Sequence, residues 1–150
     1  MRNTIGRRIF AAAFASACGV AFHGLADPAP SGNLVTRPVW SQNLDPVSLN
    51  TFYPDSAETH GVEGYAIIGC VVSEAGRLTD CSVTSEQPRR FGFGFALLNA
   101  SHNLTVSRLD EQGQPTAGRP IKLGAQFGRL KGRKRDDDQP FGVNLYVVGD

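Results

Sequence analysis

Two β-prone runs with a short loop between them decide the fold: residues 65–73 (YAIIGCVVS) and residues 78–85 (LTDCSVTS). The loop, residues 74–77 (EAGR), contains Gly76, and glycine is the residue that most readily takes the left-handed conformation of tight turns. The pattern therefore predicts a β-hairpin, and the remaining elements are placed outward from it.

The hairpin brings two cysteines together. If the Ala75-Gly76 pair is the centre of the turn, facing residues have numbers that add to 151, so Cys70 faces Cys81. Directly opposed residues of antiparallel strands have Cα atoms about 4.5–5.5 Å apart, a distance that a disulfide can span. We therefore expect a Cys70–Cys81 disulfide, with two reduced core cysteines as the alternative. A glycine bulge at the turn would shift this register by one residue. The expected apolar face of the hairpin consists of Ala66, Ile68, Cys70, Val72, Thr79, Cys81 and Val83.

The segments around the hairpin complete a mixed α and β pattern. Pro54, followed by acidic residues and then Gly61, predicts a short helix over residues 55–60. Apolar residues spaced four, three and four apart predict a second helix over residues 94–103. Strict alternation over residues 119–127 predicts a half-buried strand after a turn-rich loop, and residues 142–148 are expected to add a short terminal strand. The helical face consists of Phe93, Leu97, Ala100 and Leu104.

The N-terminus has the layout of a secretory signal peptide. Three arginines precede an uncharged apolar run at residues 9–22, and small residues suit cleavage after Ala26. Because spanning a membrane takes about 20 apolar residues, an uncleaved inner-membrane anchor is the less favoured alternative. We therefore expect residues 1–26 to be removed on export.

Charge and composition limit the classes of partner. Removal of three arginines with residues 1–26 leaves 12 basic and 14 acidic side chains, a net charge of −2. This balance argues against a nucleic-acid partner, and no later segment has the length and apolarity of a membrane span. Residues 27–50 are rich in Pro, Ser, Asn and Asp, which predicts an extended, partly disordered lead-in. Residues 129–150 are expected to form a charged tail around a basic and then acidic run at 129–138.

Candidate catalytic and metal-binding residues are few. His60 at a helix end and His102 on the outer face of a helix occupy positions typical of ordinary surface residues. Cys70 and Cys81 lack the CxxC spacing of redox and zinc pairs. Three consecutive acids at 136–138 lack the converging geometry of a cation site. The sequence therefore predicts a protein without catalytic residues, metal or cofactor.

A series of short motifs follows in a characteristic order through residues 51–128. They are Tyr53-Pro54, Ala57, Gly61 and Glu63-Gly64 before the hairpin, Glu74-Ala75-Gly76-Arg77 at its turn, Ala96-Leu97 in the second helix, and Gly113-Gln114-Pro115, Gly118-Arg119-Pro120 and Phe127 around the last strand. Together these motifs resemble the C-terminal domain of the TonB family, in a subgroup with paired hairpin cysteines. The resemblance implies an α+β, two-layer domain, with two helices on one face of a three-stranded antiparallel sheet.

The resemblance also implies a partner and a site. In that family the last strand offers its edge to an extended segment of an outer-membrane transporter, a mode of binding called β-augmentation. The matching positions here are Arg119, Ile121, Lys122, Leu123, Gly124, Ala125, Gln126 and Phe127. We therefore expect a periplasmic protein that binds a TonB-dependent transporter or a related envelope partner, in energy transduction for transmembrane transport.

One departure from the family pattern supports an alternative. A full energy transducer has an inner-membrane helix and a long spacer, whereas residues 27–50, at about 3.1 Å per residue, are too few to cross the periplasm. The alternative is a periplasmic structural or regulatory binding module that keeps the fold without a transport role. Such a module would contact the envelope through the basic run at residues 129–135.

Overall fold

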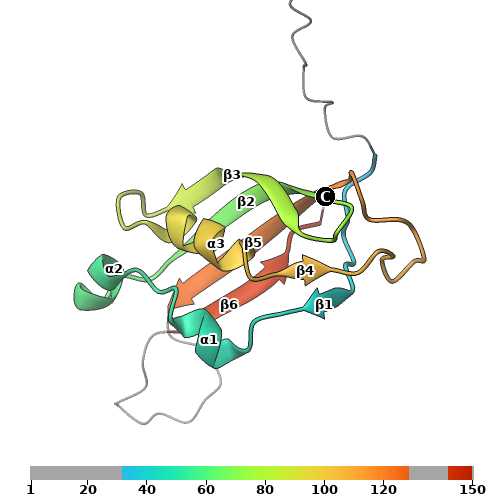
Figure 1. Ribbon diagram of the computed structural model, residues 1–150. Coiled ribbons are helices and arrows are strands. Elements are labelled where there is room, and N and C mark those ends of the chain that lie inside the picture. The colour runs from blue at the N-terminus through green and yellow to red at the C-terminus, as the bar shows by residue number, and fades with distance from the viewer. Residues whose placement is uncertain (1–31, 129–141, 150) are drawn as a thin grey trace, which may run out of the picture.

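The structure, a computed structural model, describes residues 32–128 and 142–149 (Figure 1). It confirms the α+β class. Within these ranges no helix has the length and apolarity needed to cross a membrane. The expected signal peptide and the charged run at 129–138 lie outside the described residues. The elements, in chain order, are β1 (Trp40–Gln42), α1 (Pro46–Asn50), α2 (Asp55–Thr59), β2 (Gly64–Val72), β3 (Leu78–Gln87), α3 (Phe93–Ser101), β4 (Thr105–Val106), β5 (Pro120–Gly128) and β6 (Gly142–Val147).

The main sheet has four antiparallel strands in the order β3-β2-β5-β6, and β1 and β4 form a separate two-stranded sheet. Figure 1 shows α3 lying across the main sheet and α1 beside β6. We expected a sheet of three strands, and the observed main sheet has one strand more. The fourth is β6, which was expected only as a short terminal strand and which pairs along β5.

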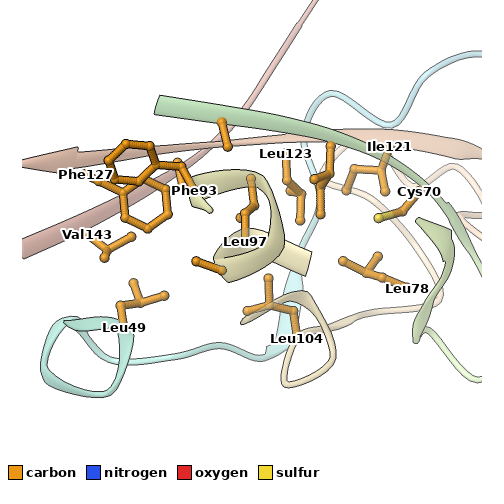
Figure 2. Packing of buried hydrophobic residues seen from close by; sticks show 14 of the residues in the cluster. Leu49, Cys70, Leu78, Phe93, Leu97, Leu104, Ile121, Leu123, Phe127 and Val143 are labelled. Atoms are coloured by element: carbon orange, nitrogen blue, oxygen red, sulfur yellow. The ribbon is translucent and has the colours of Figure 1, made fainter. Parts of the chain in front are cut away.

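The core lies between the main sheet and the helices α3 and α1 (Figure 2). The predicted apolar face of the second helix is confirmed, because its four residues are at most 2% exposed. The predicted alternation of β5 is confirmed too, with Ile121, Leu123, Ala125 and Phe127 all buried. At one end of the core, the ring of Tyr53 meets those of Phe93 and Phe127 edge-on.

The hairpin register differs from the predicted one near the turn, agrees with it in the middle of the hairpin, and differs again at the far end, where Ile67 faces Ser85 and facing numbers add to 152. Close to the turn Val72 faces Leu78, so facing numbers add to 150, while Gly69 faces Ser82 and restores the sum of 151. Asp80 lies at the irregularity between these pairs with a φ of 51°, a conformation that Asp tolerates better than most residues. The turn thus shifts the register by one residue, and a bulge at Asp80 shifts it back.

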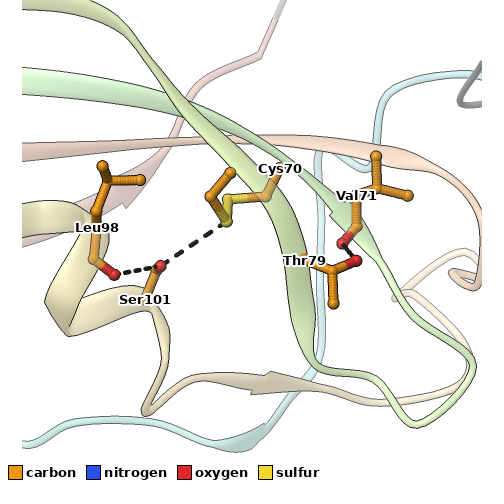
Figure 3. The surroundings of a disulfide bond; sticks show 6 residues. Cys70, Val71, Thr79, Leu98 and Ser101 are labelled. Atoms are coloured by element: carbon orange, nitrogen blue, oxygen red, sulfur yellow. Dashed lines mark hydrogen bonds between the residues drawn. A yellow bond between two sulfur atoms is a disulfide. The ribbon is translucent and has the colours of Figure 1, made fainter.

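This pair of shifts decides which side chains enter the core. The first-strand members of the expected apolar face are buried, but Thr79 and Val83 are exposed and Cys81 is partly buried. Leu78 is buried in place of Thr79. Beyond the bulge, Cys81 comes opposite Cys70 and the predicted disulfide forms, with the two Cα atoms 4.1 Å apart. Figure 3 shows Ser101 of α3 beside the bond, with its Oγ atom 3.8 Å from Cys81 Sγ and donating to Leu98 O at 2.7 Å.

The ordered domain begins before residue 51, where we expected its boundary. Val35 is fully buried, and its backbone N–H donates to Pro120 O at 2.8 Å. The guanidinium of Arg119 donates to the carbonyl oxygens of Asn33 and Leu34 and forms an ion pair with Asp110 at 2.9 Å. The described part of the expected lead-in, residues 32–50, is therefore part of the fold, because Arg119 and Pro120 bind its beginning, β4 pairs with β1, and β6 contacts α1.

Candidate binding groove at the free edge of β6

The strand expected to bind a partner, β5, is an inner strand of the sheet. It pairs with β2 from Pro120 to Phe127 and with β6 from Leu123 to Gly128. Its alternate side chains lie in the core, Arg119 holds the N-terminal segment, and both of its edges are occupied along most of its length. The predicted site residues from Ile121 to Phe127 therefore lie together on β5, with Arg119 just before it, but they do not form an open edge, because β6 pairs with residues 123–128.

The open edge on this side of the sheet belongs to β6. The backbone N–H of Val148 donates to Lys122 O at 3.0 Å, which fixes the alternation of the ladder. By that alternation, the N–H and C=O groups of Val143, Leu145 and Val147 point away from β5. Among the described residues, no backbone group bonds to the outward groups of Leu145 or Val147. Within the described part of the chain, these two residues therefore present strand hydrogen-bonding groups without a backbone partner, the feature to which an added strand binds.

The outward N–H of Val143 is already bonded. It donates to Asn50 Oδ1, the side chain of the last residue of α1, at 3.1 Å. Val143 is 4% exposed, whereas Leu145 and Val147 are only partly buried. Helix α1 therefore closes the beginning of the β6 edge and leaves the rest open.

A groove of about 390 Å³ follows the open part of this edge. One side is formed by β6 and the other by the segment that connects β1 with α1. None of the described lining residues carries a charge, and most are apolar. The lining consists of Trp40, Asn43, Leu44, Leu49, Val143, Asn144, Leu145, Tyr146 and Val147.

The opposite edge of the sheet, on β3, is less suited to strand addition. Its pairing with β2 contains two irregularities, one of them at Asp80, and natural sheets use such bulges to prevent further pairing. By contrast, β6 pairs with β5 in an unbroken register over six residues. The regular edge with the groove is therefore the better candidate for strand addition.

Sequence reasoning missed the groove because two of its elements, β1 and α1, were not foreseen. Only Trp40 was conspicuous, as a lone tryptophan in a polar segment. One local signal for α1 was present, because Asp45 precedes Pro46 as a capping residue precedes the first helical position. In the structure the Asp45 carboxylate accepts the Ser48 N–H at 3.0 Å. That signal predicts the helix, but it does not show that the helix packs beside β6.

Two of the motif residues that carry the TonB resemblance, Tyr53 and Gly76, support the fold. The Tyr53 hydroxyl donates to Val62 O at 2.8 Å, and burial, followed by the nearby Glu63 and Glu58, raises the pKa of Tyr53 to about 12. Gly76 has a φ of 79° and lies so close to Val106 O that a Cβ atom there would overlap it. These positions hold the fold together and lie away from the groove.

The histidines and acids form no metal centre in the part of the chain that the structure describes. His60 Nδ1 lies 2.7 Å from Ser56 O beside the ring of Phe91, and exposed His102 follows the last turn of α3. The acids at 136–138 lie outside the described residues. The arrangement of the described residues supports binding through backbone pairing and an apolar groove.

The chain matches no protein-family model, and a comparison with curated proteins finds no relative.

Proposed function

We propose that this protein is a non-enzymatic, TonB C-terminal-like binding module of the periplasm. It takes up an extended segment of an outer-membrane TonB-dependent transporter, or of a related envelope protein, as an added strand. The observation that carries the proposal is the open edge of β6 at Leu145 and Val147 beside an uncharged groove. The partner class comes from the motif pattern of residues 51–128.

Two features support this assignment. The Cys70–Cys81 disulfide suits an oxidising compartment such as the periplasm. Moreover, strand addition at β6 needs no rearrangement of the sheet, whereas addition at β5 along residues 123–128 requires β6 to leave. The binding strand is therefore β6 in this proposal, one strand further out than the resemblance alone implies.

The test is a titration of the isotope-labelled protein with synthetic peptides from the N-terminal segments of such transporters, followed by amide chemical shifts. The expected result is a set of shifts at Leu145, Val147 and the groove residue Leu44. Absence of shifts in β6 at millimolar peptide would overturn the proposal.

A proline variant tests whether binding uses the backbone. Because the Leu145 N–H points away from β5, Leu145→Pro removes an outward donor without removing a β5–β6 bond. Leu145→Ala is the matched control, since it also loses the side chain but keeps the N–H. We expect the proline variant to bind at least about fivefold more weakly than the alanine variant, the effect of one lost hydrogen bond with an unpaired partner. Equal affinities would contradict strand pairing.

The pairing of β5 with both β2 and β6 favours the alternative function, a periplasmic structural or regulatory module. The strand that matches the transporter-binding strand of the TonB family is paired on both sides. If deletion of residues 129–138 abolishes association with the envelope fraction while Leu145→Pro leaves it unchanged, the alternative replaces the transport role.

A further inference from the structure

The side chain of Asn50 occupies the place that a partner strand would take at Val143. In strand addition, an outward N–H donates to a carbonyl oxygen of the incoming chain. Here the Val143 N–H donates instead to an amide carbonyl oxygen, Asn50 Oδ1, from a residue 93 positions earlier in the chain. A side-chain amide thus supplies the same acceptor that a partner backbone would supply.

Burial along β6 follows this contact. Val143 is 4% exposed and packs in the core cluster with Leu49 of α1, which Figure 2 shows beside it. Leu145 and Val147 are partly buried and border the open groove. The boundary between the closed and open parts of the edge therefore lies between Val143 and Leu145, where α1 ends.

We infer that Asn50 is a specificity-determining residue that limits strand addition to the Leu145–Val147 part of the edge. This inference rests on the proposed function. The groove then takes a short extended segment whose groove-facing side chains are uncharged, because none of the described lining residues could pair with a charge. A longer segment must displace the Asn50 amide before it can pair with Val143.

Two substitutions distinguish the effect of the acceptor atom, Asn50 Oδ1, from the effect of the rest of α1. Asn50→Ala removes the oxygen and frees the Val143 N–H, whereas Asn50→Asp keeps an oxygen at the same position. The probe is the blocked pentapeptide TVTVT, whose uncharged side chains suit the groove and whose length exceeds the open edge. The readouts are its affinity and the hydrogen-exchange rate of the Val143 amide, with and without peptide.

We expect Asn50→Ala to bind the peptide about 2- to 10-fold more tightly than the wild-type protein, the effect of one additional hydrogen bond. In that variant the peptide should slow exchange at Val143, and in the wild-type protein and Asn50→Asp it should not. Unchanged or weaker binding by a folded Asn50→Ala variant would overturn the inference. Peptide-dependent protection of Val143 in the wild-type protein would overturn it as well, even if the alanine variant fails to fold.

The outcomes also distinguish the two proposals. If neither TVTVT nor the transporter peptides shift β6 in any variant, strand addition itself is refuted. If peptides bind at Leu145 and Val147 but Asn50→Ala behaves as the wild-type protein does, only the role of Asn50 is refuted.

Discussion

The aromatic ring of Tyr146 lies directly over the α-carbon of Gly124. The two residues face each other in the β5–β6 register, and Gly124 alternates along β5 with the core residues Leu123 and Ala125, so the pair lies on the opposite face of the sheet from the core. A Cβ atom built on Gly124 would be 2.4 Å from Cε2 and Cζ of the ring. The ring covers a strand position that has no side chain of its own and shields the backbone there, so that Gly124 is buried although its strand neighbours Lys122 and Gln126 are exposed.

Gly124→Ala is expected to turn the Tyr146 ring away from the sheet and leave the backbone in place. The overlapping atoms belong to the far end of a side chain that is 41% exposed, so the ring has space to move. The free energy of unfolding should therefore fall by only about 1 kcal/mol, near the typical effect of a point substitution. Chemical denaturation measures the loss, and the ring signals of Tyr146 should shift.

Gly64→Ala is the contrasting substitution in the same sheet. A Cβ at Gly64 would lie 2.4 Å from the backbone Gln87 O and from the buried ring of Phe93, neither of which can move freely. Overpacking of this kind costs about 1–3 kcal/mol, and contact with a backbone atom places the expected loss in the upper part of that range. A loss no greater than that of Gly124→Ala would show that the β2 end of the core is loosely packed.

The Cys70–Cys81 disulfide is expected to contribute about 2–3 kcal/mol to the free energy of unfolding, since it closes a loop between residues 11 positions apart. The double variant Cys70→Ala/Cys81→Ala should lose this amount in chemical denaturation. Wild-type protein in the presence of a reductant provides the matched comparison and should unfold at a similar denaturant concentration. Intact mass before and after reduction should differ by the two hydrogens of one disulfide.

Asp110 should make stability depend on pH in the acid range. The backbone N–H of Gln114 lowers the pKa of Asp110 most strongly, and Arg119 and the N–H of Gln112 lower it further. Because the folded-state pKa lies below the unfolded value of about 3.9, the stabilisation is present above that pH and is lost as the pH falls through the folded-state value. Asp110→Asn should therefore destabilise the protein at pH 7, and the difference should shrink on acidification.

The control for Asp110 is Glu111→Gln, which changes an exposed carboxylate in the same loop. Its free energy of unfolding should follow that of the wild-type protein across the same pH range. If Asp110→Asn and the wild-type protein instead lose stability in parallel between about pH 5 and about pH 2, on either side of the reference pKa of Asp, the Asp110 interactions would not be the source of the pH dependence.

Tyr53 should have the opposite dependence, at alkaline pH. Its folded-state pKa is about 12, against about 10 in the unfolded chain, so the neutral phenol stabilises the fold below pH 10 and this contribution is lost as the pH rises toward 12. Tyr53→Phe should cost about 0.5–1.5 kcal/mol at pH 7 through the lost bond to Val62 O. Above pH 10 the difference in the free energy of unfolding between Tyr53→Phe and the wild-type protein should narrow. Tyr65→Phe, the same change at an exposed site, is the control substitution at pH 7 and should cost less.

Local signals predicted the elements whose causes are local. The proline and acidic residues at the start of α2, the apolar spacing of α3 and the alternation of β5 each reflect chemistry within one segment, and the structure has all three. Strands β1 and β4 were missed because they are three and two residues long and exist through the pairing of Trp40 with Val106. Such a pairing leaves no periodicity in the sequence.

The hairpin illustrates how a correct contact can follow from an incorrect register. The shift at the turn and the bulge at Asp80 have opposite effects, so Cys81 meets Cys70 although Val72 faces Leu78. The location of the open edge could not be predicted in this way. Whether a strand is internal depends on what pairs with it, and the partner of β5 comes from residues 142–147, beyond a charged run.

The contacts of Arg119 have a consequence for the order in which the chain can fold during its synthesis. The β2–β3 hairpin needs only residues 64–87, so it can form while later residues are still being added. The segment at Asn33 and Leu34, although made first, has to wait until Arg119 emerges before its backbone finds those hydrogen bonds. Until Arg119 has been synthesised, the segment at Asn33 and Leu34 lacks these donors, so this part of the fold closes late although it is made early.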